Sequence, residues 1–216
     1  MKINPFHRFV RSALWALLGA GCANALANPT KWEFQVFLDD TAIGHHHFMV
    51  NDKGAERELV TNARFDVKVL FISAYRYAHD ASERWRGNCL TSLNARTDDN
   101  GKPSVVQADQ QGESTSVVSP RGREALDGCV MSFAYWNPEI LRQTRLLNSQ
   151  TGQYESVKIV AIGEDKITAR GVLVQAKRYR ITGPKNPIDV WYGADNHWLA
   201  LQSTLEGGRR LRYTLK

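Results

Sequence analysis

The sequence lacks an N-terminal apolar run long enough to cross a membrane as a helix. The run over residues 13–20 is far shorter than the roughly 20 residues that a spanning helix needs. It follows Lys2, Arg8 and Arg11, with no acidic residue among them, and precedes Ala25-Leu26-Ala27. A basic segment, a short apolar run and a small-residue site, in that order, are typical of a secretion signal. We therefore predict a cleaved signal peptide over residues 1–27, export to the periplasm and no transmembrane span in the mature chain.

Two alternatives to this cleaved signal remain open. An uncleaved membrane anchor is disfavoured by the short apolar run. A lipoprotein cut before Cys22 is disfavoured by Gly19, which stands where such sites usually have a larger aliphatic residue.

Cysteine is scarce, and its scarcity agrees with export. The chain has three cysteines, of which Cys22 would leave with the signal peptide. Cys89 and Cys129 remain, and two cysteines in an exported chain most simply form a disulfide. Two free buried thiols are the alternative. Neither cysteine lies in a C-x-x-C motif, which argues against a redox-active pair.

An excess of charge of one sign is also missing. The formal net charge of +6 falls to +3 when the three basic residues of the signal are removed. So modest a surplus gives no case for nucleic-acid binding. Repeats, low-complexity tracts and Ser/Pro-rich linkers are absent, so we expect residues 28–216 to form a single domain.

Signatures of nucleophilic catalysis are absent as well. The sequence has neither Gly-x-Ser-x-Gly nor Ser-x-x-Lys, and a disulfide would leave no cysteine to act as a thiolate. Asp98 and Asp99 lie in a turn-like Asp-Asp-Asn-Gly sequence rather than in a pattern typical of paired catalytic acids. We predict no catalytic residues and a chain that is not an enzyme.

A histidine run at residues 45–47 is the one hint of a metal site. On a strand, His45 and His47 would share a face and could offer two imidazoles to a metal. Zinc and copper sites need a third ligand, and no spacing in the sequence supplies one. We predict no metal and no cofactor, and retain His45 and His47 as weak metal candidates.

Apolar and polar residues alternate over much of the chain. Trp32, Phe34, Val36 and Leu38 alternate with polar neighbours, and similar patterns recur over residues 199–205 and 211–215. A period of two is typical of half-buried strands. Asn, Asp and Gly clusters separate the runs, as tight hairpins require, and Gly207-Gly208 marks a closing hairpin. We predict a mostly β fold: a strongly curved antiparallel meander sheet or partly open β-barrel of about ten strands.

One helix is expected to interrupt this meander over residues 137–148. Asn137 can cap it, and Pro138 suits the first helical position. Ile140, Leu141, Thr144 and Leu147 would then share one face, so that the helix would cover the sheet.

Large aromatic residues are the main candidates for ligand binding. A curved sheet can hold an apolar or carbohydrate ligand on its concave side if aromatic rings line it. The alternative is that these rings belong to an ordinary core. The candidate ligand-binding residues are Trp85, Tyr135, Trp136, Trp191 and Trp198.

Several motifs together resemble a known family. They are Cys89-Leu90-x-x-Leu93, Thr97-Asp98-Asp99-Asn100-Gly101, Tyr135-Trp136-Asn137-Pro138, Leu146-Leu147-Asn148-x-x-Thr151-Gly152 and Trp191-Tyr192. In these the chain resembles an exported proteobacterial domain-of-unknown-function family, the one numbered sixty-one thirty-four. The resemblance implies a periplasmic β protein and carries no activity, so that no functional residue is transferred from it.

The function expected from the sequence is that of a periplasmic binding or accessory protein. Its ligand would be apolar, lipid-like or a glycan, held in an aromatic-lined concavity. The first alternative is a structural or assembly partner of a cell-envelope protein, which would dock through exposed strand edges. The second alternative is a hydrolase whose site the sequence does not reveal.

Overall fold

The structure is a computed structural model that describes residue 1, residues 28–69 and residues 72–216. The predicted signal peptide, residues 1–27, lies outside the described residues apart from Met1. The described chain forms fifteen strands and two short 3₁₀ helices. The strands are β1 (Thr30–Leu38), β2 (Thr41–Lys53), β3 (Glu56–Val69), β4 (Ile72–Arg86), β5 (Cys89–Asp99), β6 (Lys102–Gln111), β7 (Ser114–Ser119), β8 (Gly122–Asp127), β9 (Arg145–Leu147), β10 (Tyr154–Ser156), β11 (Lys158–Ala169), β12 (Val172–Thr182), β13 (Ile188–Tyr192), β14 (Trp198–Thr204) and β15 (Arg210–Leu215).

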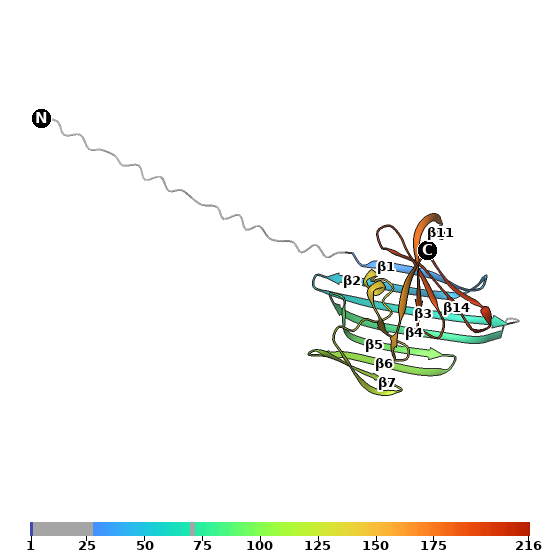
Figure 1. Cartoon of the computed structure of the whole chain (residues 1–216), viewed down its shortest axis with the longest axis horizontal. Helices are drawn as coiled ribbons and strands as arrows, with labels where there is room; N and C mark the ends of the chain where they lie inside the picture. The colour runs from blue at the N-terminus through green and yellow to red at the C-terminus, as the bar shows by residue number, and fades with distance from the viewer. Residues whose placement is uncertain (2–27, 70–71) are drawn as a thin grey trace.

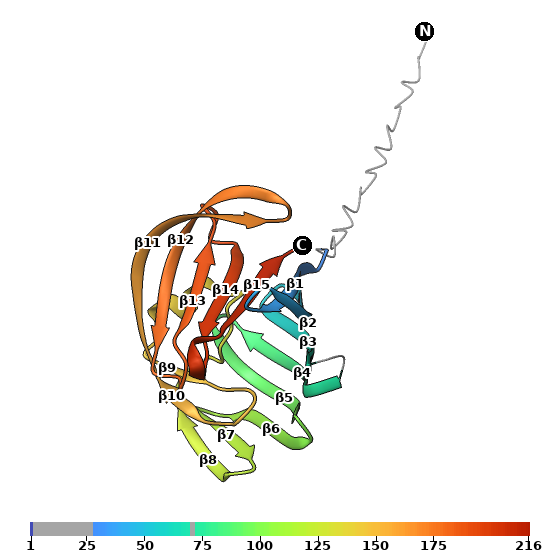
Figure 2. The same ribbon diagram turned by 90° about the vertical axis from the view of Figure 1, so that its right-hand side faces the viewer.

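Thirteen of the strands form one antiparallel sheet in the order β11-β12-β13-β14-β15-β1-β2-β3-β4-β5-β6-β7-β8. The first strand of the chain pairs with the last, so the two ends of the domain meet in the middle of the sheet. Figures 1 and 2 show the sheet wrapping round on itself. The predicted curved antiparallel sheet is confirmed, and it stays open because β11 and β8 are its two end strands.

The alternation that predicted the sheet corresponds to its inner face. Trp32, Phe34, Val36 and Leu38 are buried, while their neighbours along β1 are exposed or partly buried. The closing hairpin of β14 and β15 is present as well. Its connection is longer than the predicted Gly-Gly loop, because a 3₁₀ turn, η2 (Glu206–Gly208), lies between the strands.

The predicted number of about ten strands is too low. The sheet includes the short strands β7 and β8, and β9 and β10 form a separate hairpin. In the edge strand β11 most side chains are exposed or partly buried, so it lacks the period of two that would reveal it. Strands that pack one face only weakly leave little trace in the sequence.

The predicted helix over residues 137–148 is wrong. Asn137 does cap a helical turn, since its side chain accepts a hydrogen bond from the Glu139 amide, but this turn is η1 (Pro138–Arg142), a 3₁₀ helix of five residues. Gln143 is already extended, and residues 145–147 form β9. The amide of Leu147 donates to the Met131 carbonyl at 2.8 Å. Such long-range backbone bonds replace the hydrogen bonds that a continuing helix would have made.

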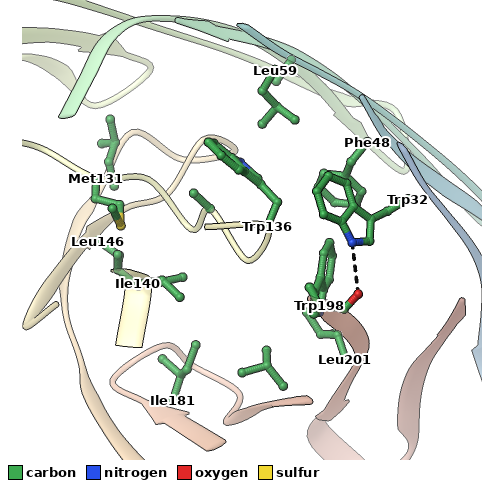
Figure 3. Close-up of a cluster of buried hydrophobic side chains, with 14 of the residues drawn as sticks. Trp32, Phe48, Leu59, Met131, Trp136, Ile140, Leu146, Ile181, Trp198 and Leu201 are labelled. Atoms are coloured by element: carbon green, nitrogen blue, oxygen red, sulfur yellow. Dashed lines mark hydrogen bonds between the residues drawn. The ribbon is translucent and has the colours of Figure 1, made fainter. Parts of the chain in front are cut away.

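Residues 128–157, between β8 and β11, form an inner segment that contributes much of the core. Within it Met131, Ile140, Leu146 and Leu147 are almost fully buried. Figure 3 shows Met131, Ile140 and Leu146 facing the sheet residues Leu59, Phe48 and Trp198. The inner segment thus supplies the second layer that a curved sheet needs to bury its concave face.

A disulfide joins this inner segment to the sheet. Cys89, at the start of β5, is bonded to Cys129 with an S–S distance of 2.04 Å. The amide of Leu90 donates to the Val130 carbonyl at 2.8 Å and continues the link. The predicted pairing of the two cysteines is confirmed. Among the described residues, no helix has the length and apolarity needed to cross a bilayer.

Candidate functional site

The concave side of the sheet holds three adjoining cavities. The central cavity, of about 840 Å³, lies between β2, β13, β14 and β15 and the loops 148–153 and 183–186. The deep pocket, of about 150 Å³, lies between β3, β4 and residues 132–136. The end pocket, of about 690 Å³, lies near Tyr75 and Tyr77. Gln150 lines all three, so they form one extended space under the same loop.

Aromatic rings form the floor of the central cavity. Trp198 lies with its ring centre 5.0 Å from that of Phe48 and 5.4 Å from that of Tyr135. The Trp198 ring is held in place because its Nε1 donates a hydrogen bond to the Ala200 carbonyl. The backbone carbonyl of Trp198 accepts a hydrogen bond from Trp32 Nε1 at 3.0 Å (Figure 3). The floor is therefore rigid and apolar.

The opposite wall of the central cavity is more polar. It includes Gln153 and Lys185 from the two loops and Glu155 from β10. The loop 183–186 approaches β10 so closely that a Cβ built on Gly183 would lie 2.0 Å from the Ser156 carbonyl oxygen, and Gly183 has a φ of +122°. An apolar floor under a polar rim suits a ligand with both kinds of surface.

Glu83 is the main buried acid of the deep pocket. Its carboxyl accepts hydrogen bonds from Trp85 Nε1 at 2.9 Å and from the Ser132 hydroxyl at 3.1 Å. Burial raises the pKa of Glu83 to about 7, although both hydrogen bonds oppose the rise. The bond to Ser132 links the sheet to the inner segment through a carboxyl that changes charge near neutral pH.

Two inward histidines line the same pocket. His46 Nε2 is 2.8 Å from Thr61 Oγ1, and Thr61 itself donates to the His47 carbonyl. The hydroxyl therefore accepts from His46, which assigns the proton to Nε2. His79 Nδ1 is 2.9 Å from Thr97 Oγ1. Burial lowers the pKa of His79 to about 4 and that of His46 well below its usual value, so both are neutral at pH 7.

The structure brings together most of the aromatic residues singled out in the sequence. Tyr135 and Trp198 line the central cavity, and Tyr135 and Trp136 line the deep pocket. Trp85 is fully buried behind Trp136, with its ring perpendicular to it at 5.5 Å between centres. These four rings form one cluster between the sheet and the inner segment.

Trp191 does not join this cluster. It pairs with Ala200 across β13 and β14, one position away from Val190 and Leu201, and so lies on the opposite face of the sheet. There its Nε1 donates to Asp165 at 2.8 Å. Trp191 is buried at 8% exposure under the β11–β12 hairpin and is separate from the three cavities on the concave side.

The weak metal candidates His45 and His47 stack on each other, with ring centres 4.6 Å apart, on the face opposite His46. Within residues 28–69 and 72–216, no three His, Cys, Asp or Glu side chains gather in a metal-binding group.

Sequence reasoning missed the polar residues of the deep pocket. Glu83 and His79 share the inner face of β4, where Ala81 and Trp85 are also buried. A charged residue at an inward position of an alternating strand is the signal that could have revealed Glu83, since buried acids are uncommon unless hydrogen-bonded.

Comparison with known proteins gives a family but no activity. A family model described as a domain of unknown function, DUF6134, matches residues 34–216. No curated protein matches the chain. Among solved structures, a beta-barrel-like protein of the domain of unknown function DUF1849 from Brucella abortus is similar, with a TM-score of 0.64 and 11% identity. The alignment covers 87% of this chain and 95% of that one, and at this identity it shows the fold alone.

Proposed function

Since the chain belongs to the DUF6134 family, as its motifs predicted, and that family carries no assigned activity, we propose a function from the geometry of the site. The protein is a non-enzymatic binding protein of the periplasm. It holds an amphipathic, mostly apolar ligand in the central cavity of its curved sheet. The observation that carries this proposal is the volume of about 840 Å³ between an aromatic floor and a polar rim. Cavities of about 300–1,000 Å³ are typical of small-molecule sites.

The disulfide supports the proposed compartment. The Cys89–Cys129 bond is of a kind that persists in oxidising compartments such as the periplasm. It agrees with the signal peptide predicted over residues 1–27, and both point to a protein that works after export.

The hydrogen bonds of the interior support a binding role over a hydrolytic one. A threonine nucleophile would need to give its proton to a histidine. Thr61 instead gives its proton to the His47 carbonyl and accepts one from His46. Ser132 donates to Glu83, which at about pH 7 is half protonated. These contacts fix the polar groups in place and favour recognition.

Native mass spectrometry of the mature protein, purified from the periplasm without detergent, tests the proposal. We expect a bound small-molecule mass that organic extraction removes. A matched pair of variants locates it: Trp198→Ala removes the floor of the central cavity and should lower the retained fraction, whereas Trp191→Ala should not, although both rings are buried. A protein that carries no small molecule and binds no apolar dye would overturn the proposal.

A role as an assembly partner is the second candidate, and the edge strand β11 favours it. This strand ends the sheet and exposes Val160 at 38% and Ile162 at 46%. Exposed strand edges can pair with a strand of another protein. The same native spectra would then contain a stoichiometric protein partner and no small molecule.

A further inference from the structure

We propose that the deep pocket is a subsite for an uncharged, oxygen-bearing group, such as a hydroxyl or an ester carbonyl, at one end of an otherwise apolar ligand. This inference rests on the proposed function, because the apolar part of the same ligand would lie in the central cavity. Three observations carry it: an unpaired buried donor, a wall without fixed charge, and the small volume of the pocket.

The unpaired donor is the indole nitrogen of Trp136. This residue lines the deep pocket and is 7% exposed, yet its Nε1 makes no hydrogen bond to the described residues. By contrast, the indole nitrogens of Trp32, Trp85, Trp191 and Trp198 all donate to oxygen atoms. A buried donor without a partner costs about 1–3 kcal/mol. Since an indole can only donate, the group that satisfies Trp136 must offer an acceptor oxygen.

The ring of Trp136 lines the deep pocket and is packed between the sheet and the inner segment. Figure 3 shows its ring between the sheet residue Leu59 and Ile140 of the inner segment. Trp85 packs against it edge to face, and the Arg57 guanidinium lies 4.8 Å from its ring centre. The ring is therefore held on several sides by its neighbours.

The wall of the deep pocket offers no fixed charge. Its lining residues include no lysine, arginine or aspartate. Burial raises the pKa of Glu83 to about 7 and lowers that of His79 to about 4 and that of His46 well below its usual value, so that below pH 7 Glu83 is mostly protonated and both histidines are neutral. An ionised head group would lose its hydration here without a counter-charge, at a cost of several kcal/mol. A neutral group avoids that cost.

The volume of the pocket fits a head group and excludes a long chain. An interior cavity of about 150 Å³ takes a molecule the size of benzene. The deep pocket shares His46, Phe48, Tyr135 and Ile188 with the central cavity, so a chain attached to the head group can continue over the aromatic floor. The arrangement suits a neutral ester or alcohol of a fatty chain.

Calorimetric titration of the mature protein at about pH 6.5 with three probes of equal chain length tests this inference. The probes are 1-monolauroylglycerol, laurate and dodecyltrimethylammonium, which are neutral, anionic and cationic. We expect the neutral probe to bind at least tenfold more tightly than either ion. Trp136→Phe keeps the aromatic ring and removes Nε1, so it should weaken binding of the glyceride about fivefold, the effect of one neutral hydrogen bond. It should leave laurate binding unchanged.

Trp191→Phe is the matched control, because Trp191 is also buried but its Nε1 is bonded to Asp165 on the opposite face of the sheet, away from the deep pocket. It should leave the preference for the glyceride intact. If all three probes bind within threefold of one another, or if Trp136→Phe binds the glyceride as the wild type does, the subsite is refuted while the binding function stands. If none of the three binds, the proposed function itself fails.

Discussion

The titration of Glu83 gives the most detailed prediction about this fold. Its carboxyl has an unfolded pKa of about 4.5 and a folded pKa of about 7, because burial disfavours the charged form. The folded state therefore binds the proton more tightly than the unfolded state. The resulting stability is fully present below about pH 4.5 and is lost as the pH rises through 7. At 1.36 kcal/mol per pKa unit, the loss is about 3 kcal/mol.

Glu83→Gln isolates this loss, since glutamine keeps the shape of the protonated acid and can still bond Trp85 and Ser132. At low pH the variant and the wild type should have the same free energy of unfolding. Between pH 4.5 and 8 the variant should become the more stable of the two, by up to about 3 kcal/mol. His79 titrates in the opposite sense, because its lowered pKa makes its contribution present above pH 6.5 and lost as the pH falls through about 4. His79 titrates in both proteins, so its contribution cancels when the free energies of unfolding of the wild type and the variant are subtracted.

Urea unfolding followed by tryptophan fluorescence at five pH values between 4.5 and 8.5 measures this difference. Glu113→Gln serves as the control, since Glu113 is exposed and its replacement should shift the curve by less than about 0.5 kcal/mol. If the difference between wild type and Glu83→Gln stays constant across this range, the carboxyl is not held in its protonated form and the neutral character of the deep pocket is refuted.

Two further predictions concern the frame around the cavity. Cys129→Ser opens a loop of 40 residues and should lower the free energy of unfolding by about 4 kcal/mol on chain-entropy grounds, measured by urea unfolding; a loss below about 1 kcal/mol would mean that the inner segment is held without the disulfide. Gly44→Ala should cost about 3 kcal/mol, because its Cβ would lie 1.9 Å from a backbone carbonyl oxygen at a φ of +153°. Gly87→Ala, at a φ of +58° with open space around it, should cost only about 1–2 kcal/mol, and equal losses in the two variants would contradict this contrast.

The sequence predicts the sheet well because burial on one face of a strand leaves a direct pattern. Trp32, Phe34, Val36 and Leu38 alternate in the sequence and are buried in the structure. The disulfide follows from cysteine number and export alone. Both predictions need only local information or a count, and neither needs the arrangement of strands in space.

The remaining features depend on contacts between distant segments. Val190, Trp191 and Tyr192 of β13 are buried on both faces of the sheet, so alternation could not show that Trp191 points away from the cavities. The apolar residues at 140–147 fit a helix by spacing, yet long-range backbone bonds to Met131 and other segments draw them into a strand. Glu83 was missed because Ser132, one of its two carboxyl partners, lies 49 residues further along the chain.

The most direct test of the central claim blocks the cavity from its rim. The side chain of Gln150 is exposed and lines all three cavities, while its backbone amide and carbonyl bond to Asn148 and Ser104 and should keep the loop in place. We would titrate the mature protein, its Gln150→Trp variant and the exposed-strand control Gln110→Trp with the neutral dye N-phenyl-1-naphthylamine. The account predicts bright binding to the wild type and the control and at least a fivefold loss in Gln150→Trp without loss of stability. Equal dye binding by all three proteins, or none by the wild type, would contradict it.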